Sequence, residues 1–370
     1  MRASLNCSSL IMNTEQGKGI FLLTMTHKTT IVDIARIANK SVTSVSLALN
    51  NRPGVSKKTR RKIIKLAAKL DYRPNYAAKQ LTGKFSQTIG LIIENITDPF
   101  YPEIALGVEE KATELGYGVL IYNTGGSLIK EKKGLDDFRA RGVDGVILST
   151  VTIDDQNIKL LIDERFPFVC LNRFSLDPAI KDRVDYVALD NYACGYKGIE
   201  HFYRLGHDQI ALFTGSMNKS TALMRTDGAI RAIEKFGIVQ DSKLVVDCEF
   251  LRDKAFEKAK ILLSQKNYPK AFFCQDDNMA IGVREAILNL GLKIPENVSL
   301  MGINDIKEAS LIGIDLTTIS QNIYQMGTTG AEILIKRIQK VESNMVNQII
   351  MNSEICIRKS CGYYLKGYVR

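Results

Sequence analysis

Residues 30–50 read TIVDIARIANKSVTSVSLALN and predict two short helices separated by a tight turn. Thr30 is a good N-cap for the first helix, and Asp33 can return the bond in a capping box. The apolar side chains of this helix recur at helical spacing and form one stripe; they are Ile31, Ile34, Ala35 and Ala38. The first half of the stretch therefore predicts a helix with one buried face.

The turn and a second helix follow directly. Asn39 and Lys40 interrupt the apolar pattern, and Asn accepts the positive φ that a sharp turn requires. Ser41 can cap a second helix over residues 42–49, whose inward side chains are Val45, Ala48 and Leu49. Helix, short turn and helix is the layout of a DNA-reading helix-turn-helix, whose second helix enters the major groove. An ordinary helical hairpin inside a core is the alternative for these residues alone.

The charge around this stretch favours the DNA-binding interpretation. Residues 28–84 carry fourteen Lys or Arg against two acidic residues, Asp33 and Asp71. Their net charge of +12 exceeds the +10 of the whole chain, so the basic excess is confined to this segment. A basic segment of this kind is the electrostatic footprint of a protein that binds phosphate backbones.

The flanks of the helix-turn-helix complete a small domain. Residues 1–26 show no periodicity, and we expect a disordered or mis-called extension without a signal peptide, with Met25 as the natural start. Ser56 can cap a third helix whose inward side chains are Ile63, Ile64, Leu66, Ala67 and Leu70. A short helix after Asn75 is too short to be stable alone. We therefore expect a headpiece over 27–74 and a hinge helix with linker over 75–86.

The rest of the chain alternates apolar strand-like runs with helical stretches. The runs are 89–93, 117–122, 144–149, 168–171, 186–190, 210–214, 243–246, 271–274 and 299–303, and the chain closes with strand-like residues 349–361. This alternation predicts an α/β fold of two-lobed, doubly wound parallel sheets behind an all-α headpiece. We expect one domain over 87–370, with a first lobe over about 87–172 plus 320–341. The second lobe is expected over about 173–319 plus the C-terminal strands.

Composition excludes several other classes of protein. No apolar run is long enough to span a membrane. The seven Cys lack metal or disulfide spacing, which indicates reduced thiols and a cytoplasmic location. The three His (His27, His201 and His207) have no metal-ligand spacing, and the chain contains no GxSxG, P-loop or GxGxxG motif. We therefore predict neither enzyme activity nor a cofactor or metal.

The ordered motifs of the chain resemble the LacI/GalR family of bacterial transcriptional regulators over residues 29–361. The motifs are TIVDIARIA, SVTSVSLALNN, VSKKTRRKI, LDYRPNYAAKQL, IGLIIENITDPFYPEI, VDGVILS, RLGHDQIALFTG, DDNMAIGV and GINDI. The resemblance implies a dimeric repressor with a periplasmic-binding-protein-like domain behind the headpiece. It also implies double-stranded operator DNA and a small effector, of carbohydrate type, as partners. The effector is expected between the lobes, at the carboxyl ends of the strands.

The resemblance also assigns DNA contacts. Val42, Thr43, Ser44 and Ser46 are expected to face the DNA from the second helix, and Leu81 to enter the minor groove. Leu47 stands where the family often has Arg, which predicts a non-standard operator half-site. The complete set of predicted DNA-binding residues is Thr30, Val42, Thr43, Ser44, Ser46, Leu47, Asn50, Tyr72, Asn75, Ala78 and Leu81.

An effector site is implied by further matches. Arg225 matches the family's Arg that grips effector oxygens, and Asn304 stands where Asp is common. Other candidates follow strand ends, so the predicted effector-binding residues are Asp98, Phe100, Tyr101, Asn123, Ser149, Arg173, Arg225, Asp276 and Asn304. Two alternatives stay open: a catabolite-control-type regulator with a phosphocarrier protein as corepressor, and a solute-binding protein without a DNA role.

Overall fold

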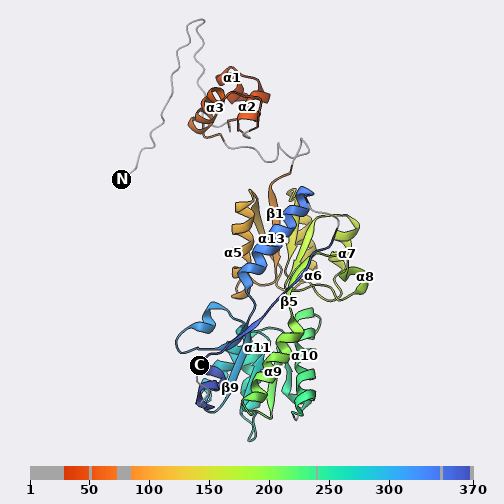
Figure 1. Cartoon of the computed structure of the whole chain (residues 1–370), viewed down its shortest axis with the longest axis vertical. Coiled ribbons are helices and arrows are strands. Elements are labelled where there is room, and N and C mark those ends of the chain that lie inside the picture. The colour runs from red at the N-terminus through yellow and green to blue at the C-terminus, as the bar shows by residue number, and fades with distance from the viewer. Residues whose placement is uncertain (1–28, 50–51, 73–84, 239–240, 342–344, 367–370) are drawn as a thin grey trace, which may run out of the picture. The chain divides into compact units, whose positions relative to one another are not determined.

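The computed structural model describes residues 29–49, 52–72, 85–238, 241–341 and 345–366 (Figure 1). The chain divides into two compact units, one up to Thr82 and the other from Gly83 onward. Three helices form the described part of the first unit, here called the headpiece: α1 (Ile31–Ala38), α2 (Val42–Leu49) and α3 (Lys57–Lys69). Four residues predicted to contact DNA lie outside the described residues: Asn50, Asn75, Ala78 and Leu81.

The headpiece helices share one small apolar core, which confirms the predicted helix-turn-helix. Its buried members are Ile34, Ala35, Val45, Ala48, Ile63 and Ala67. The capping box is also present, because Thr30 N donates to Asp33 over 2.9 Å and Asp33 N donates to the Thr30 hydroxyl over 3.3 Å. The inward prediction for Ile64 is wrong, since that side chain is 49% exposed. Ile63 and Ala67, four residues apart, lie on the buried face of α3. Ile64 is the next residue after Ile63, so the rotation of the helix places its side chain toward solvent.

Asn39 forms the turn between α1 and α2 in the predicted left-handed conformation. Its φ is 48° and its ψ is 51°. Its backbone N–H donates to the carbonyl groups of Ala35 and Arg36, which closes α1. The left-handed conformation costs roughly 1–2 kcal/mol for a residue with an ordinary side chain, whereas Gly adopts it freely.

The stability of the headpiece should therefore depend on whether the residue that replaces Asn39 tolerates the left-handed conformation. We expect Asn39→Ala to destabilise the headpiece by about 1 kcal/mol, because Ala strains in the left-handed conformation. Asn39→Gly should leave stability unchanged or slightly raised. Amide hydrogen exchange of α1 and α2 in the full chain measures both, and Lys40→Ala is the neighbouring control. Equal acceleration of exchange in the Gly and Ala variants would contradict the prediction.

The second unit contains two lobes, each built on a six-stranded sheet. The first sheet has the order β11-β5-β4-β3-β1-β2, and neighbouring strands are parallel. Its strands are β1 (Thr88–Ile93), β2 (Gly118–Asn123), β3 (Gly145–Leu148), β4 (Phe168–Leu171), β5 (Tyr186–Leu189) and β11 (Gln348–Met351). Apolar residues cover both faces. Helices α5 (Phe100–Glu114) and α13 (Ile323–Gln339) pack on one face, and α6 (Leu128–Ala140), α7 (Gln156–Asp163) and α8 (Pro178–Lys181) pack on the other.

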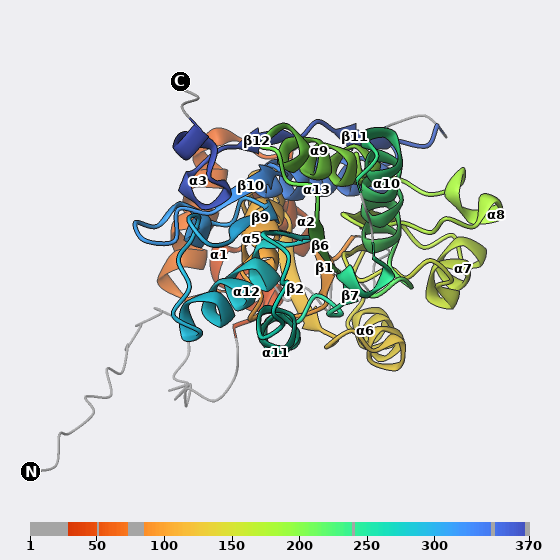
Figure 2. The ribbon, with the colours of Figure 1, turned by 90° about the horizontal axis from the view of Figure 1, so that it is seen from below.

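The second sheet has the order β12-β10-β9-β8-β6-β7. Its strands are β6 (Ile210–Thr214), β7 (Val245–Asp247), β8 (Ala271–Cys274), β9 (Ser299–Asn304), β10 (Thr317–Ser320) and β12 (Glu354–Cys356). Helices α9 (Asn191–Arg204) and α10 (Ser220–Phe236) lie on one side, and α11 (Arg252–Leu263) and α12 (Asp277–Asn289) lie on the other (Figure 2). Short 3-10 turns at Ser242–Leu244, Lys307–Ser310, Lys359–Cys361 and Tyr363–Lys366 complete this lobe.

The nine predicted strands are present, but the lobe boundary differs from the expected one. β5 pairs with β4, so the first lobe extends to Leu189 and not to about residue 172. The C-terminal strands divide between the lobes, since β11 pairs with β5 and β12 pairs antiparallel with β10. The chain thus passes between the sheets after β5, β10 and β11. β10 was not predicted because its sequence, TTIS, is polar and short.

Close helix packing positions α10 for the site described below. A Cβ on Gly195 of α9 would lie 1.9 Å from the carbonyl oxygen of Arg225, and one on Gly228 would lie 2.0 Å from the carbonyl oxygen of Tyr192. Both distances are far below van der Waals contact, so only Gly allows these backbones to approach. In the described parts of the chain, every helix is too short or too polar to cross a bilayer.

Candidate functional site

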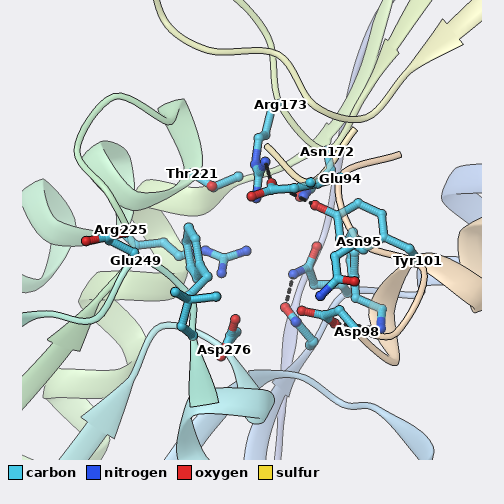
Figure 3. A pocket seen from close by; sticks show the side chains of 16 residues that line it. Glu94, Asn95, Asp98, Tyr101, Asn172, Arg173, Thr221, Arg225, Glu249 and Asp276 are labelled. Atoms are coloured by element: carbon cyan, nitrogen blue, oxygen red, sulfur yellow. Dashed lines mark hydrogen bonds and ion pairs between the residues drawn. The ribbon is translucent and has the colours of Figure 1, made fainter. Parts of the chain in front are cut away.

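A cavity of about 130 Å³ lies between the two lobes at the carboxyl ends of their strands (Figure 3). Segments after β1, β2 and β4 line it from the first lobe. Helix α10 and the carboxyl ends of β7, β8, β9 and β10 line it from the second. This is where open α/β sheets place ligand sites. The structure brings seven predicted effector residues to its wall: Asp98, Phe100, Tyr101, Arg173, Arg225, Asp276 and Asn304.

Two other predicted effector residues do not line the cavity. The Asn123 side chain accepts a hydrogen bond of 2.8 Å from Ile96 N and braces the loop after β1. Ser149 is fully buried behind the wall, and its hydroxyl has no hydrogen-bond partner among the described residues. Both lie at strand ends, but the Asn123 side chain braces a loop and the Ser149 side chain is buried in the interior.

Glu94 is the central charged group of the cavity, and the sequence argument missed it. Glu94 follows β1 and forms an ion pair with Arg173. Its Oε1 atom lies 2.5 Å from Nζ of Lys219, which belongs to the second lobe. The Tyr101 hydroxyl also donates to it over 3.1 Å. Burial disfavours its charge, but Arg173 and Lys219 outweigh burial and lower the pKa of Glu94 to about 2. Its position directly after the apolar strand β1 is the signal that could have identified it.

Arg225 is held in place by neutral groups. Its side chain is buried on α10, and Nε donates to Asn191 Oδ1 over 2.8 Å. Nη1 donates to the backbone carbonyl of Gln275. No ion pair joins Arg225 to a carboxylate in the described part of the chain. Burial lowers the pKa of Arg225 to about 10, still above neutrality, so the cavity contains a fixed, charged guanidinium.

Two carboxyl groups face the cavity from opposite lobes (Figure 3). Asp98 accepts a hydrogen bond of 3.0 Å from Phe100 N, and Asp276 caps α12 by accepting one of 2.7 Å from Met279 N. Burial raises the pKa of both groups, and the charge of Asp98 raises that of Asp276 further. The pair favours ligands that donate hydrogen bonds, because each carboxylate retains acceptor capacity.

Several buried polar atoms on the cavity wall have no hydrogen-bond partner among the described residues. They are Asn172 Oδ1, Arg173 Nε, Thr221 Oγ1 and Gln321 Oε1. An unsatisfied buried polar atom costs roughly 1–3 kcal/mol, so a cluster of them points to a ligand that supplies the missing bonds. The set contains both donors and acceptors, as a polyhydroxylated molecule requires.

Aromatic rings complete the cavity wall. Phe100 and Tyr101 form an edge-to-face pair with centroids 5.3 Å apart. Phe250, which was not predicted, lies in the loop after β7 with Arg173 and Lys219 above its ring at 5.6 and 5.5 Å. Apolar ring faces beside a few polar groups are typical of small-molecule sites.

The headpiece exposes the start of α2. Val42 is 42% exposed, Thr43 is exposed, and Ser44 and Ser46 are half-buried, while Thr30 is exposed before α1. These positions agree with the predicted DNA contacts without testing them. Tyr72 is half-buried against the headpiece core, and Leu47 lies close to Gly54, so these two side chains also stabilise the fold. Exposed Lys and Arg follow on α3: Lys57, Lys58, Arg61, Lys62 and Lys65.

A helix-turn-helix headpiece and a two-lobed unit with a polar cavity together define a ligand-responsive DNA-binding regulator. Residues 30–75 match the family model described as bacterial regulatory proteins of the lacI family. Residues 86–359 match the model for periplasmic binding proteins and the sugar binding domain of the LacI family. The chain belongs to the LacI family of transcriptional regulators.

Several proteins similar to this chain are named as transcriptional repressors. A transcriptional repressor PurR of Photobacterium profundum is 31% identical, and the match covers 90% of this chain and 98% of that protein. A probable repressor ExuR of Bacillus subtilis is 33% identical with the same coverage. The structure is similar to a Lac repressor dimer bound to operator and an anti-inducer, with a TM-score of 0.80, 25% identity, and coverage of 90% of this chain and 99% of that one.

Proposed function

We propose that the chain is a cytoplasmic repressor that acts as a dimer on operator DNA and is controlled by a small carbohydrate-type ligand in the interlobe cavity. The cluster of unpartnered buried polar atoms on the wall carries this proposal, because a polyol supplies both donors and acceptors to them. A ribose-bound LacI-family regulator of Enterococcus faecium supports the ligand class, with 26% identity, a TM-score of 0.65, and coverage of 74% of this chain and 98% of that one. The cavity volume suits one small molecule.

The proposed control acts through the arrangement of the lobes. The ligand contacts residues of both lobes, so its binding energy depends on how the lobes are placed relative to each other. A ligand shifts a conformational equilibrium only by its differential affinity for the two states. The effector therefore changes operator affinity by favouring one lobe arrangement, and operator binding changes effector affinity by the same factor.

The two alternatives receive less support. A solute-binding protein has no use for a headpiece that matches a family of DNA-binding regulators. A phosphocarrier protein is too large to enter a cavity of about 130 Å³, so it would leave the buried unpartnered atoms there unsatisfied. A pull-down with serine-phosphorylated carrier protein separates this alternative from control by a small molecule.

The salt dependence of operator binding tests the DNA-binding half of the proposal. We expect log K to fall steeply with log salt, because a duplex bound by a basic headpiece releases counterions at each neutralised phosphate. Fluorescence anisotropy with an operator selected from a random DNA library measures this slope. Each of Lys58→Gln and Lys62→Gln should reduce the slope by about 1 if the side chain contacts a phosphate. Lys266→Gln, an exposed residue of the second lobe, is the control, and a nearly flat plot for the wild type would count against the proposal.

A further inference from the structure

Three consecutive residues that lead into α10, residues 218–220, each contact a different segment of the first lobe. The backbone carbonyl of Asn218 accepts a hydrogen bond of 2.9 Å from Ile153 N, in the segment after β3. The Ser220 hydroxyl accepts one of 3.3 Å from Phe174 N, in the segment after β4. These two bonds join the lobes through backbone donors of the first lobe.

The residue between them, Lys219, adds a charged link to a third segment. Its Nζ atom lies 2.5 Å from Oε1 of Glu94, directly after β1. The two side chains are only 11% and 18% exposed, and charges removed from water interact more strongly than a pair on the surface. Arg173 of the first lobe, which lies beside Glu94 (Figure 3), also stands 5.6 Å from the ring centroid of Phe250 in the second lobe.

These contacts lie on strands that the chain crossings leave free. The chain passes between the lobes after β5, β10 and β11, and β5 and β11 are neighbours at one edge of the first sheet. Residues 218–220 contact the segments after β4, β3 and β1, which are the next three strands in the order of that sheet. Lobes joined only at their crossings can rotate about them. The contacts of residues 218–220 oppose this rotation.

We propose that residues 218–220 form a clasp that keeps the two lobes closed through the chain's own atoms, with the ion pair between Lys219 and Glu94 as its principal link. This inference goes beyond the proposed function, since it concerns the closure of the lobes whatever effector they bind. A clasp of this kind arranges both walls of the cavity before an effector arrives, so less of the binding free energy is lost on ordering the site.

Amide hydrogen exchange of the full chain, with no small molecule added, tests the clasp at single residues. Lys219→Met leaves the acceptors of Ile153 N and Phe174 N in place, so a purely local change would leave both amides protected. It also leaves Glu94 paired with Arg173, so no buried carboxylate loses all its partners. If the clasp opens as one unit, exchange at both amides should accelerate about tenfold, because exchange follows the local opening equilibrium.

A second variant reaches the same unit from its other end. Ser220→Ala removes the acceptor of Phe174 N and leaves the ion pair of Lys219 intact. Exchange at Ile153 N, whose own acceptor is untouched, should also accelerate in this variant if the three links act together. Acceleration at Phe174 N alone contradicts a cooperative clasp.

The controls separate opening of the clasp from a general loss of stability. Lys219→Arg keeps the charge and the reach, so it should exchange as the wild type does. Lys266→Met makes the same change as Lys219→Met at an exposed position of the same lobe and should have no effect. Val146 N, which donates to the Pro167 carbonyl inside the first sheet, should keep its rate in every variant.

Three results overturn the inference. The first is unchanged exchange at Ile153 N and Phe174 N in Lys219→Met. The second is an equal acceleration at Val146 N, because the first lobe itself is then loosened. The third is exchange in Lys219→Arg as fast as in Lys219→Met. Each of them leaves the proposed operator and effector binding intact, because no effector or DNA enters the experiment.

Discussion

Arg225→Met should remove effector binding almost completely while operator binding by the ligand-free protein persists. The guanidinium is buried, charged and oriented by its bonds to Asn191 and Gln275, so it presents its remaining N–H groups to the cavity without loss of side-chain entropy. A hydrogen bond to a charged group contributes roughly 1.5–3 kcal/mol. Loss of two such bonds lowers affinity by at least about a hundredfold. Calorimetry and gel-shift titration with and without the effector measure the two activities separately.

Two control variants accompany Arg225→Met: one changes another arginine of the same helix, and the other makes a conservative substitution at Arg225 itself. Arg231→Met makes the same chemical change on the exposed side of α10, where Arg231 forms an ion pair with Glu234, and should leave effector binding unchanged. Arg225→Lys keeps the charge but loses the planar fork, and should retain part of the binding. A full effector response in Arg225→Met would show that this side chain is structural.

Glu131→Gln should raise the stability of the second unit at alkaline pH. Glu131 of α6 is 1% exposed and accepts hydrogen bonds from the Thr150 hydroxyl and, over 2.8 Å, from Asn157 Nδ2. Burial, reinforced by the charge of nearby Asp155, raises the pKa of Glu131 to about 7. In the unfolded chain Glu131 loses its proton near pH 4.5, whereas the folded protein retains it up to about pH 7.

The sign of the effect follows from this difference in proton binding. The folded state binds the extra proton between these two pH values, so the wild type loses stability as pH rises from about 4.5 to about 7. The shift corresponds to about 3 kcal/mol. Glutamine keeps the hydrogen-bonding shape but never ionises, so the variant should match the wild type at pH 5 and exceed it by up to that amount at pH 8.

Urea unfolding at pH 5 and pH 8 measures the free energy of unfolding for this comparison. Asp137→Asn, on the same helix but partly exposed, is the control and should follow the pH dependence of the wild type. Buried carboxyl groups away from Glu131, such as Asp277, are present in all three proteins and cancel in the difference. A stability difference between Glu131→Gln and the wild type that is the same at both pH values would refute the assignment.

The candidate effector site was predictable in outline because parallel strands end at a common edge. A residue at or after the end of a buried strand was therefore a sound candidate, and six of the seven predicted residues on the cavity wall were of this kind. The seventh, Arg225 on α10, came from the match to the family. The same rule also selected Asn123 and Ser149, which serve a loop and the interior. The same rule should have selected Glu94, which was missed. It could not have selected Phe250, because that residue lies in a loop whose position depends on how the lobe folds.

The sequence by itself determined the headpiece. Its capping box, apolar stripes and the left-handed Asn39 depend on neighbours within a few residues, so local pattern and backbone preference were sufficient. The apolar runs that form the strands could likewise be recognised from neighbouring residues alone. Only the tertiary structure decided which strand joins which sheet, moving β5 and β11 into the first lobe. It alone paired Glu94 with Lys219 across 125 residues, because contacts between distant segments are set by how the lobes pack and cross, and no local pattern encodes them.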